Sequence, residues 1–216
     1  MMAQKAEALL RVLTGQPVIP VVAVSSAKAA VDLARALAAG GLPAIEITLR
    51  TPAALDAIRA VAADVPEAIC GAGTILTPRQ FNAAEAAGAK FIVSPGATPA
   101  LLDTADNSPV PLLPGAATPS ELMAMIARGY EMLKFFPAEQ LGGVPYLKAL
   151  APVFPTIRFC PTGGVSPKNV ADYLALPNVV CVGGSWVAPA ATLEAGDFAE
   201  VTRLSREAAG LKGAAA

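Results

Sequence analysis

The stretch Ala68-Ile69-Cys70-Gly71-Ala72-Gly73-Thr74-Ile75-Leu76-Thr77-Pro78 sets a pattern that recurs along the whole chain. Its apolar first part, Ala68–Ile75, has the character of a buried β-strand. Thr77-Pro78 then predicts a helix start, because a threonine hydroxyl caps free backbone N–H groups and a proline at the first helical position loses no hydrogen bond. Gln80 stands where a capping box needs it. The stretch is therefore one strand–helix unit.

The same unit is repeated before and after this stretch. Other helix starts are predicted at Ser26, Thr51-Pro52, Thr98-Pro99, Thr118-Pro119 (with Glu121 completing a capping box) and Ser166-Pro167. A last helical stretch runs from about Pro189 to Ala209, and Met1–Leu13 reads as an amphipathic helix. The tail, Gly210–Ala216, is expected to fray. The predicted strands are Val18–Val24, Ala44–Leu49, Ala68–Ile75, Lys90–Ser94, Val110–Leu113, Met132–Phe136, Thr156–Pro161 and Val179–Val182.

Strands that alternate with helices imply parallel pairing and right-handed crossovers. Eight such units close into a (β/α)8 TIM barrel, and 216 residues lie near the compact end of its size range. The alternative is an open doubly wound sheet, which usually has a Gly-x-Gly-x-x-Gly turn after its first strand. The chain has Ala23-Val24-Ser25-Ser26 there. The sequence thus predicts one barrel domain over residues 1–216, with an extra N-terminal helix.

The composition narrows the classes of function. A net charge of −1 gives no electrostatic case for binding nucleic acid or an anionic membrane. Charged residues make up only 15%, against roughly 25% in an ordinary domain, which favours oligomerisation. No apolar run reaches the length of about 20 residues that spans a bilayer. Three cysteines without metal-type spacing fit a reduced, cytoplasmic protein.

The chain contains no histidine. This excludes Ser-His and Cys-His nucleophile pairs and every histidine-based metal site. Acid–base chemistry must therefore use Glu, Asp, Lys, Tyr or water.

A lysine and a glutamate in predicted strands are the candidate catalytic residues. Lys134 interrupts an apolar strand, and a lysine held neutral by burial is a nucleophile towards ketones. Alternation along Ala44–Arg50 sets Glu46, Thr48 and Arg50 towards the barrel interior. Glu46 and Arg50 are either a structural ion pair or an acid–base group beside an anion clamp. The inward Lys134 favours the second interpretation.

Glycine-rich turns follow the last two predicted strands. They are Pro161-Thr162-Gly163-Gly164 and Val182-Gly183-Gly184-Ser185. The loops after strands seven and eight of such a barrel often hold a phosphate through backbone N–H groups. Thr74 ends the strand of the opening stretch and offers a hydroxyl to a ligand.

Five motifs in register resemble the 2-keto-3-deoxy-6-phosphogluconate (KDPG) aldolases, some of which also handle 4-hydroxy-2-oxoglutarate. The resemblance runs from about Pro17 to Trp186. The motifs are Glu46-Ile47-Thr48-Leu49-Arg50-Thr51, Gly71-Ala72-Gly73-Thr74, Ser94-Pro95-Gly96, Leu133-Lys134-Phe135-Phe136-Pro137 and Pro161-Thr162-Gly163-Gly164-Val165.

The resemblance implies a class I aldolase with a lysine Schiff base, no metal and no cofactor, typically a homotrimer. Its substrates would be a phosphorylated keto acid and pyruvate. Lys134 would form the imine, Glu46 would shuttle protons, and Arg50 and Thr74 would hold the carboxylate of the pyruvyl half. The remaining implied site residues are Pro95, Phe136 and Thr162 in the pocket and Gly163, Gly164, Gly184 and Ser185 at the phosphate.

Three alternatives remain open from the residues. A phosphogalactonate-specific aldolase differs from a KDPG aldolase in one substrate stereocentre that no residue identifies. A phosphosugar isomerase-type barrel would share the phosphate site without an imine-forming lysine. A barrel that binds a phosphorylated ligand without turning it over would use Lys134 as a charge partner.

Overall fold

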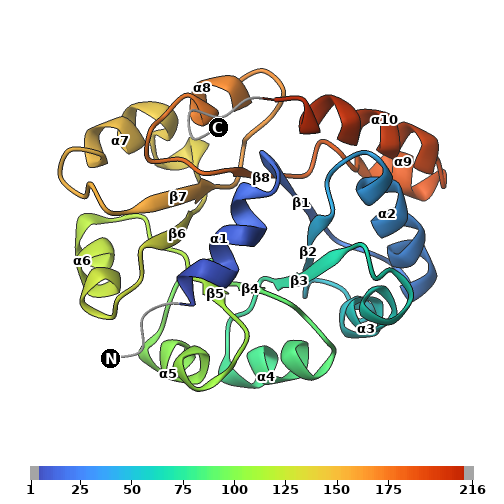
Figure 1. The fold of residues 1–216 in the computed structure, drawn as a ribbon, viewed down its shortest axis with the longest axis horizontal. Coiled ribbons are helices and arrows are strands. Elements are labelled where there is room, and N and C mark those ends of the chain that lie inside the picture. Colours follow the sequence, from blue (N-terminus) through green and yellow to red (C-terminus); the bar gives the residue numbers. More distant parts are fainter. Residues whose placement is uncertain (1–4, 212–216) are drawn as a thin grey trace.

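The computed structural model describes residues 5–211 as a ring of parallel strands surrounded by helices (Figure 1). The strands are β1 (Val18–Val22), β2 (Ala44–Thr48), β3 (Ile69–Gly73), β4 (Ile92–Val93), β5 (Leu112–Leu113), β6 (Met132–Phe135), β7 (Arg158–Pro161) and β8 (Val182–Gly184). The helices are α1 (Ala6–Thr14), α2 (Ala27–Ala39), α3 (Ala54–Asp64), α4 (Pro78–Ala86), α5 (Pro99–Asn107), α6 (Pro119–Ala127), α7 (Gly143–Leu150), α8 (Val170–Leu174), α9 (Ala190–Glu194) and α10 (Phe198–Ala209), with a 3-10 turn, η1 (Glu139–Leu141).

The sheet closes on itself. Six strands pair in the order β5-β4-β3-β2-β1-β8, and β6 pairs with β7. Parallel bridges between Gly115 and Lys134, and between Thr162 and Gly183, join the two sets. The predicted (β/α)8 barrel is confirmed, and every predicted strand overlaps an observed one, with ends that differ by at most three residues.

Most predicted helix starts are confirmed by capping contacts. The side chains of Ser26, Thr77, Thr98 and Thr118 each accept a backbone N–H of their helix. Glu121 completes the capping box at Thr118. At Thr77 the reciprocal half differs, because the Gln80 side chain accepts from the N–H of Leu76.

Two predicted helix starts are wrong. The Thr51 hydroxyl donates to the carbonyl of Val24, and α3 begins only at Ala54. Ser166 donates its N–H to the Asn169 side chain, and α8 begins at Val170. The dipeptide pattern predicts that both residues cap a helix. Each instead makes a hydrogen bond with a tertiary or loop partner, and the helix begins further along the chain.

The predicted last helical stretch is two helices, α9 and α10. Between them Gly196 has a φ of 67°, a left-handed conformation that ends α9 and that glycine adopts readily. The predicted N-terminal helix is α1. Its first predicted residues, 1–4, and the tail residues 212–216 lie outside the described part of the chain.

The core has two parts, one on each side of the sheet. Alternate strand residues pack outward against the helices, as Ile45 and Ile47 do. The others fill the barrel interior, where α1 adds Leu9, Val12 and Leu13. This helix crosses one end of the ring in Figure 1. It thereby covers the end at which the strands begin.

Gln16 ties α1 to the sheet. Its amide nitrogen donates to the carbonyls of Val18 (2.7 Å) and Ala44 (2.9 Å), and its amide oxygen accepts from the Ala44 N–H (2.7 Å). The covered end is thus held by hydrogen bonds as well as by apolar packing. The opposite end, where the strands finish, is left for the site. Among the helices of residues 5–211, none has both the length and the apolar character needed to cross a membrane.

Candidate active site

Strand alternation places a glutamate and a lysine inside the barrel. Ile45 and Ile47 face the helices, so Glu46 faces inward on β2. On β6, Met132 packs in the interior and Leu133 packs outward, which sends Lys134 inward as well. Glu46 is only 3% exposed and Lys134 only 6%. Both orientations agree with the sequence analysis.

The two side chains meet. Lys134 Nζ donates to Glu46 Oε1 at 3.3 Å. The Phe136 ring lies to one side, with its centroid 5.4 Å from Nζ. An amine and a carboxylate at this distance can exchange a proton directly, in an interior where water competes little.

A glycine makes room for the glutamate. A Cβ atom on Gly73 would lie 2.0 Å from Glu46 Oε1, so β3 can pass this carboxylate only if it has no side chain there. Likewise, a Cβ atom on Gly71 would lie 2.3 Å from Cζ of the Phe91 ring, so this ring also needs a glycine beside it. The structure adds Gly73 as a residue that positions Glu46.

Thr74, directly after β3, has an unusual backbone. Its φ of 59° is left-handed, which for a β-branched residue is a true outlier. Such strain costs about 1–3 kcal/mol and concentrates at functional sites.

The neighbouring strand, β2, ends in Thr48, which is buried as expected, whereas Arg50 lies in the turn beyond β2 and is exposed. Because β2 ends before it reaches Arg50, strand alternation does not fix the direction of this side chain, and its inward orientation stays a prediction.

The ends of β6 and β7 are joined next to Lys134. The N–H of Ala138 donates to the carbonyl of Thr162 at 2.9 Å. A Cβ on Gly163 would lie 3.3 Å from the Phe136 ring, so this loop and this ring are in contact. Thr162 is buried and lies against Gly183 of β8. The structure thus brings three predicted site residues, Phe136, Thr162 and Gly163, to one rim of the barrel.

The remaining predicted residues lie at the same end of the barrel. Gly163 and Gly164 are consecutive left-handed residues, with φ of 99° and 79°. Gly184 ends β8 against the Trp186 ring, and Ser185 after it is exposed. Pro95 follows β4, and its carbonyl lies where a side chain on Gly115 would be. Glycine pairs of this kind can present N–H groups to an anion.

The cysteines lack the features of nucleophiles. All three are free and buried. Burial raises the pKa of Cys70 to about 12. Contact with Cys160, together with burial, raises the pKa of Cys181. Protonated thiols do not attack carbonyls, which leaves Lys134 as the candidate nucleophile at this barrel end.

Comparison with known proteins shows which family the chain belongs to. The family model described as KDPG and KHG aldolase matches residues 9–204. The chain belongs to this aldolase family. KHG/KDPG aldolase of Escherichia coli (strain K12) is 54% identical over 197 residues, covering 91% of this chain and 92% of that protein. As a member of the family the chain is an aldolase, a carbon–carbon lyase, and the isomerase-type alternative no longer applies.

Two solved structures of aldolases share the fold. One is a crystal structure of KDPG aldolase from Legionella pneumophila with pyruvate captured at low pH as a covalent carbinolamine intermediate. It is 45% identical, with a TM-score of 0.91, and the match covers 93% of this chain and 98% of that one. The other is the Zymomonas mobilis ZM4 KDPG aldolase with 3-phosphoglycerate, 44% identical, with a TM-score of 0.92 and coverage of 97% and 98%.

Proposed function

We propose that the chain is a class I aldolase that cleaves KDPG to pyruvate and glyceraldehyde 3-phosphate. The observation that carries the proposal is the buried contact between Lys134 and Glu46. It provides an amine nucleophile and a proton shuttle within one hydrogen bond, as imine chemistry requires. The relatives named KDPG aldolase support the choice of substrate.

The reaction begins with attack of the Lys134 amine on the C2 ketone of the substrate. The carbinolamine loses water, and its oxygen leaves after accepting a proton from Glu46. The resulting protonated imine accepts the electron pair of the C3–C4 bond when that bond breaks. Glu46, directly or through a water, removes the proton of the C4 hydroxyl, which becomes the carbonyl of the released aldehyde.

An enamine of pyruvate is then left on Lys134. Protonation at C3 restores the imine, and addition of water releases pyruvate and the free amine. Arg50 and Thr74, at the ends of neighbouring strands, would bind the carboxylate of the pyruvyl half. Pro95, Phe136 and Thr162 would line the pocket. Gly163, Gly164, Gly184 and Ser185 would bind the phosphate.

Borohydride reduction in the presence of pyruvate tests the imine. Reduction should add the pyruvyl group irreversibly to one peptide, and mass spectrometry should place the added mass on Lys134. The matched control is Lys134→Met, which keeps a chain of similar length and should remain folded, unlabelled and inactive. A label on another residue, or normal turnover by Lys134→Met, would overturn the mechanism.

A second substrate follows from the same site. 4-Hydroxy-2-oxoglutarate carries the same keto acid half but no phosphate, so the imine steps would be unchanged. The relatives named KHG/KDPG aldolase favour this activity. Comparing pyruvate release from KDPG, its galactonate epimer and 4-hydroxy-2-oxoglutarate would rank the three and decide the stereochemical alternative.

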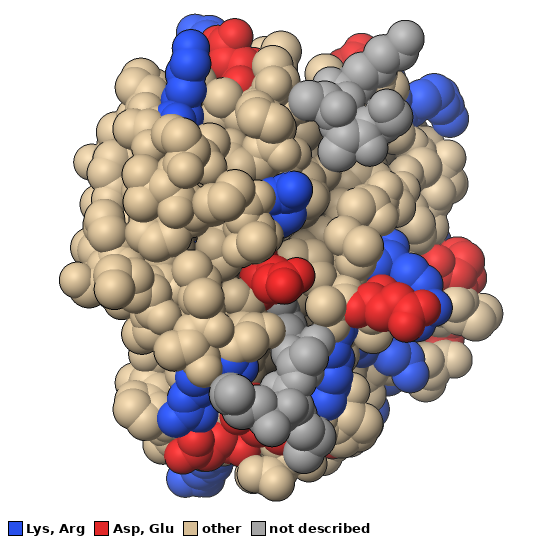
Figure 2. Space-filling model, turned by 60° about the vertical axis from the view of Figure 1, so that its left-hand side comes forward, with Lys and Arg blue, Asp and Glu red and all other residues tan. Residues whose placement is uncertain are grey.

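The homotrimer is proposed on surface character. Met123 is 64% exposed and Ile126 42% exposed on α6, and Val153 beyond α7 is 66% exposed. In Figure 2 much of the surface on the side of α6 and α7 carries no charged side chain. Such a surface favours association. Light scattering after size-exclusion chromatography should give three times the chain mass.

The three free, buried cysteines support the further proposal of a reducing, cytoplasmic location.

A further inference from the structure

The glycine loop after β7 rests on a residue outside the predicted site. The side chain of Glu139, in η1, lies against Gly164, where an added Cβ would meet its Cγ at 2.5 Å. The backbone N–H of Glu139 also donates to the carbonyl of Gly163 at 3.1 Å. One residue thus supports the loop with both its backbone and its side chain.

Tyr173 of α8 holds the Glu139 side chain in this place. Its hydroxyl donates to Glu139 Oε1, and its ring is fully buried. Burial, and then the hydrogen bond and charge of Glu139, raise the pKa of Tyr173, so it stays a neutral donor. Gly143 makes room for the pair: a Cβ there would lie 2.9 Å from both Glu139 Oε1 and the Tyr173 hydroxyl.

The second glycine carbonyl is held too. Asn169 Nδ2 donates to the carbonyl of Gly164 at 3.2 Å. In a trans peptide the C=O and the N–H point in opposite directions. Because the carbonyls of Gly163 and Gly164 point to Glu139 and Asn169, the N–H groups of Gly164 and Val165 point away from them. The two hydrogen bonds therefore fix the orientation of both N–H groups, as anion binding by backbone requires.

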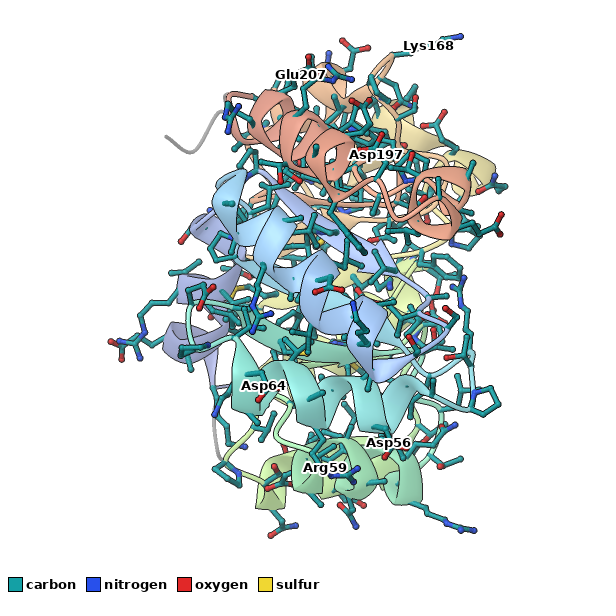
Figure 3. All side chains as sticks on the ribbon, turned by 90° about the vertical axis from the view of Figure 1, so that its right-hand side faces the viewer. Asp56, Arg59, Asp64, Lys168, Asp197 and Glu207 are labelled. Atoms are coloured by element: carbon teal, nitrogen blue, oxygen red, sulfur yellow. The ribbon has the colours of Figure 1, made fainter. Side chains whose placement is uncertain are left out.

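Figure 3 shows the Lys168 side chain extending outward from the segment after β7. Affinity for the phosphate would then depend on how well the N–H groups are positioned. The Glu139 carboxylate, if it were released from Tyr173, could itself turn to these N–H groups and compete with the phosphate.

We propose that Glu139 and Tyr173 are positioning residues that set the glycine loop for the phosphate of the substrate. This inference rests on the proposed function, because it assigns the phosphate to that loop. It concerns only the phosphorylated half of the substrate. Binding of the pyruvyl half at Lys134 should not depend on either residue.

The experiment compares a reaction that needs the phosphate with one that does not. The first is cleavage of KDPG, measured as kcat and KM. The second is borohydride labelling with pyruvate, measured as the pyruvate concentration that gives half-maximal labelling. Glu139→Ala and Tyr173→Phe should each raise KM for KDPG about tenfold, the effect of losing a well-placed hydrogen bond. The half-maximal pyruvate concentration should change less than about twofold.

Two further variants separate positioning from general stability. Glu139→Gln keeps the size and an acceptor oxygen for Tyr173, so it should restore most of the affinity for KDPG. Tyr130→Phe is the matched control, because Tyr130 is also buried and donates to a carboxylate, Asp106, at 3.3 Å. It should leave both measurements unchanged.

The outcomes are distinct. Equal losses in KDPG cleavage and in pyruvate labelling would indicate a merely structural role and would overturn the inference. An unchanged KM in Glu139→Ala, a substitution at an exposed position, would also overturn it. Wild-type protein that is not labelled by pyruvate would instead overturn the proposed function, and the inference with it.

Discussion

Lys134 and Glu46 touch across the full width of the barrel, although they are 88 residues apart in the chain. Their strands, β6 and β2, stand half a turn apart in a ring of eight. Only two long side chains can meet in this way. The contact therefore needs a closed barrel, and any change in curvature would separate the nucleophile from its proton shuttle.

Glu46→Gln should separate imine formation from cleavage. The amide keeps the shape and a hydrogen-bond acceptor for Lys134, but it cannot take up a proton. We expect kcat to fall by about 10²–10⁴-fold, the usual contribution of a general acid–base group. Borohydride with pyruvate should still label Lys134. An unchanged kcat would remove Glu46 from the mechanism.

Gly73→Ala should act through Glu46. The added methyl group would lie 2.0 Å from Glu46 Oε1, so the carboxylate must move. A shift of about 1 Å in a catalytic group can cost about 100-fold in rate, and we expect a loss of kcat of that order. The backbone of Gly73 is extended, a conformation that alanine also adopts.

The control for that variant is Gly210→Ala, where the added Cβ would make only ordinary contact, 3.5 Å from a carbonyl. Thermal unfolding of both variants would show that the barrel persists. Full activity in Gly73→Ala would contradict the positioning role of this glycine.

Thr74→Gly should make the protein more stable and weaken its binding of pyruvate. Glycine adopts the left-handed φ of 59° without strain, although it loses more conformational freedom on folding. We expect a net gain of about 1 kcal/mol in the free energy of unfolding, measured by denaturant titration. The loss of the hydroxyl should raise the pyruvate concentration needed for labelling. A less stable variant would mean that this φ carries no strain.

The capping box of α6 should make stability depend on pH. Burial raises the pKa of Glu121, but hydrogen bonds from the N–H groups of Ala117 and Thr118 and from the Thr118 hydroxyl outweigh it, and the pKa is lowered. The stabilisation is therefore present at neutral pH and is lost as the pH falls through the lowered pKa.

Glu121→Gln tests this because its side chain does not titrate. At neutral pH the wild-type protein should have the higher melting temperature. At about pH 3, near or below the pKa of an ordinary glutamate, the difference should shrink. A difference that does not change with pH would show that the charge of Glu121 contributes nothing.

Local signals in the sequence predicted most of the fold. Thr77, Thr98 and Thr118 cap helices because each lies within one turn of the N–H groups that it binds. The same signal failed at Thr51, because the carbonyl of Val24, beyond the end of β1, accepts its hydroxyl. A dipeptide carries no information about a partner that the fold brings from elsewhere.

For the site, too, the sequence predicted the local features and missed the tertiary ones. Alternation along a strand was enough to predict that Glu46 and Lys134 face inward. It could not show that β2 ends before Arg50, or that Gly73 makes room for Glu46. The contact of Tyr173 with Glu139 joins α8 to η1, and nothing in either segment alone indicates it. Packing between distant segments decides these features.

The helix across the start of the strands has a kinetic consequence. Because Leu9, Val12 and Leu13 fill that end in the described part of the chain, ligands should enter and leave through the mouth formed by the strand ends. Pyruvate, attached at the buried Lys134, would stay behind the aldehyde until the aldehyde has gone. Product release should then be ordered, and in the synthetic direction the keto acid should enter before the aldehyde.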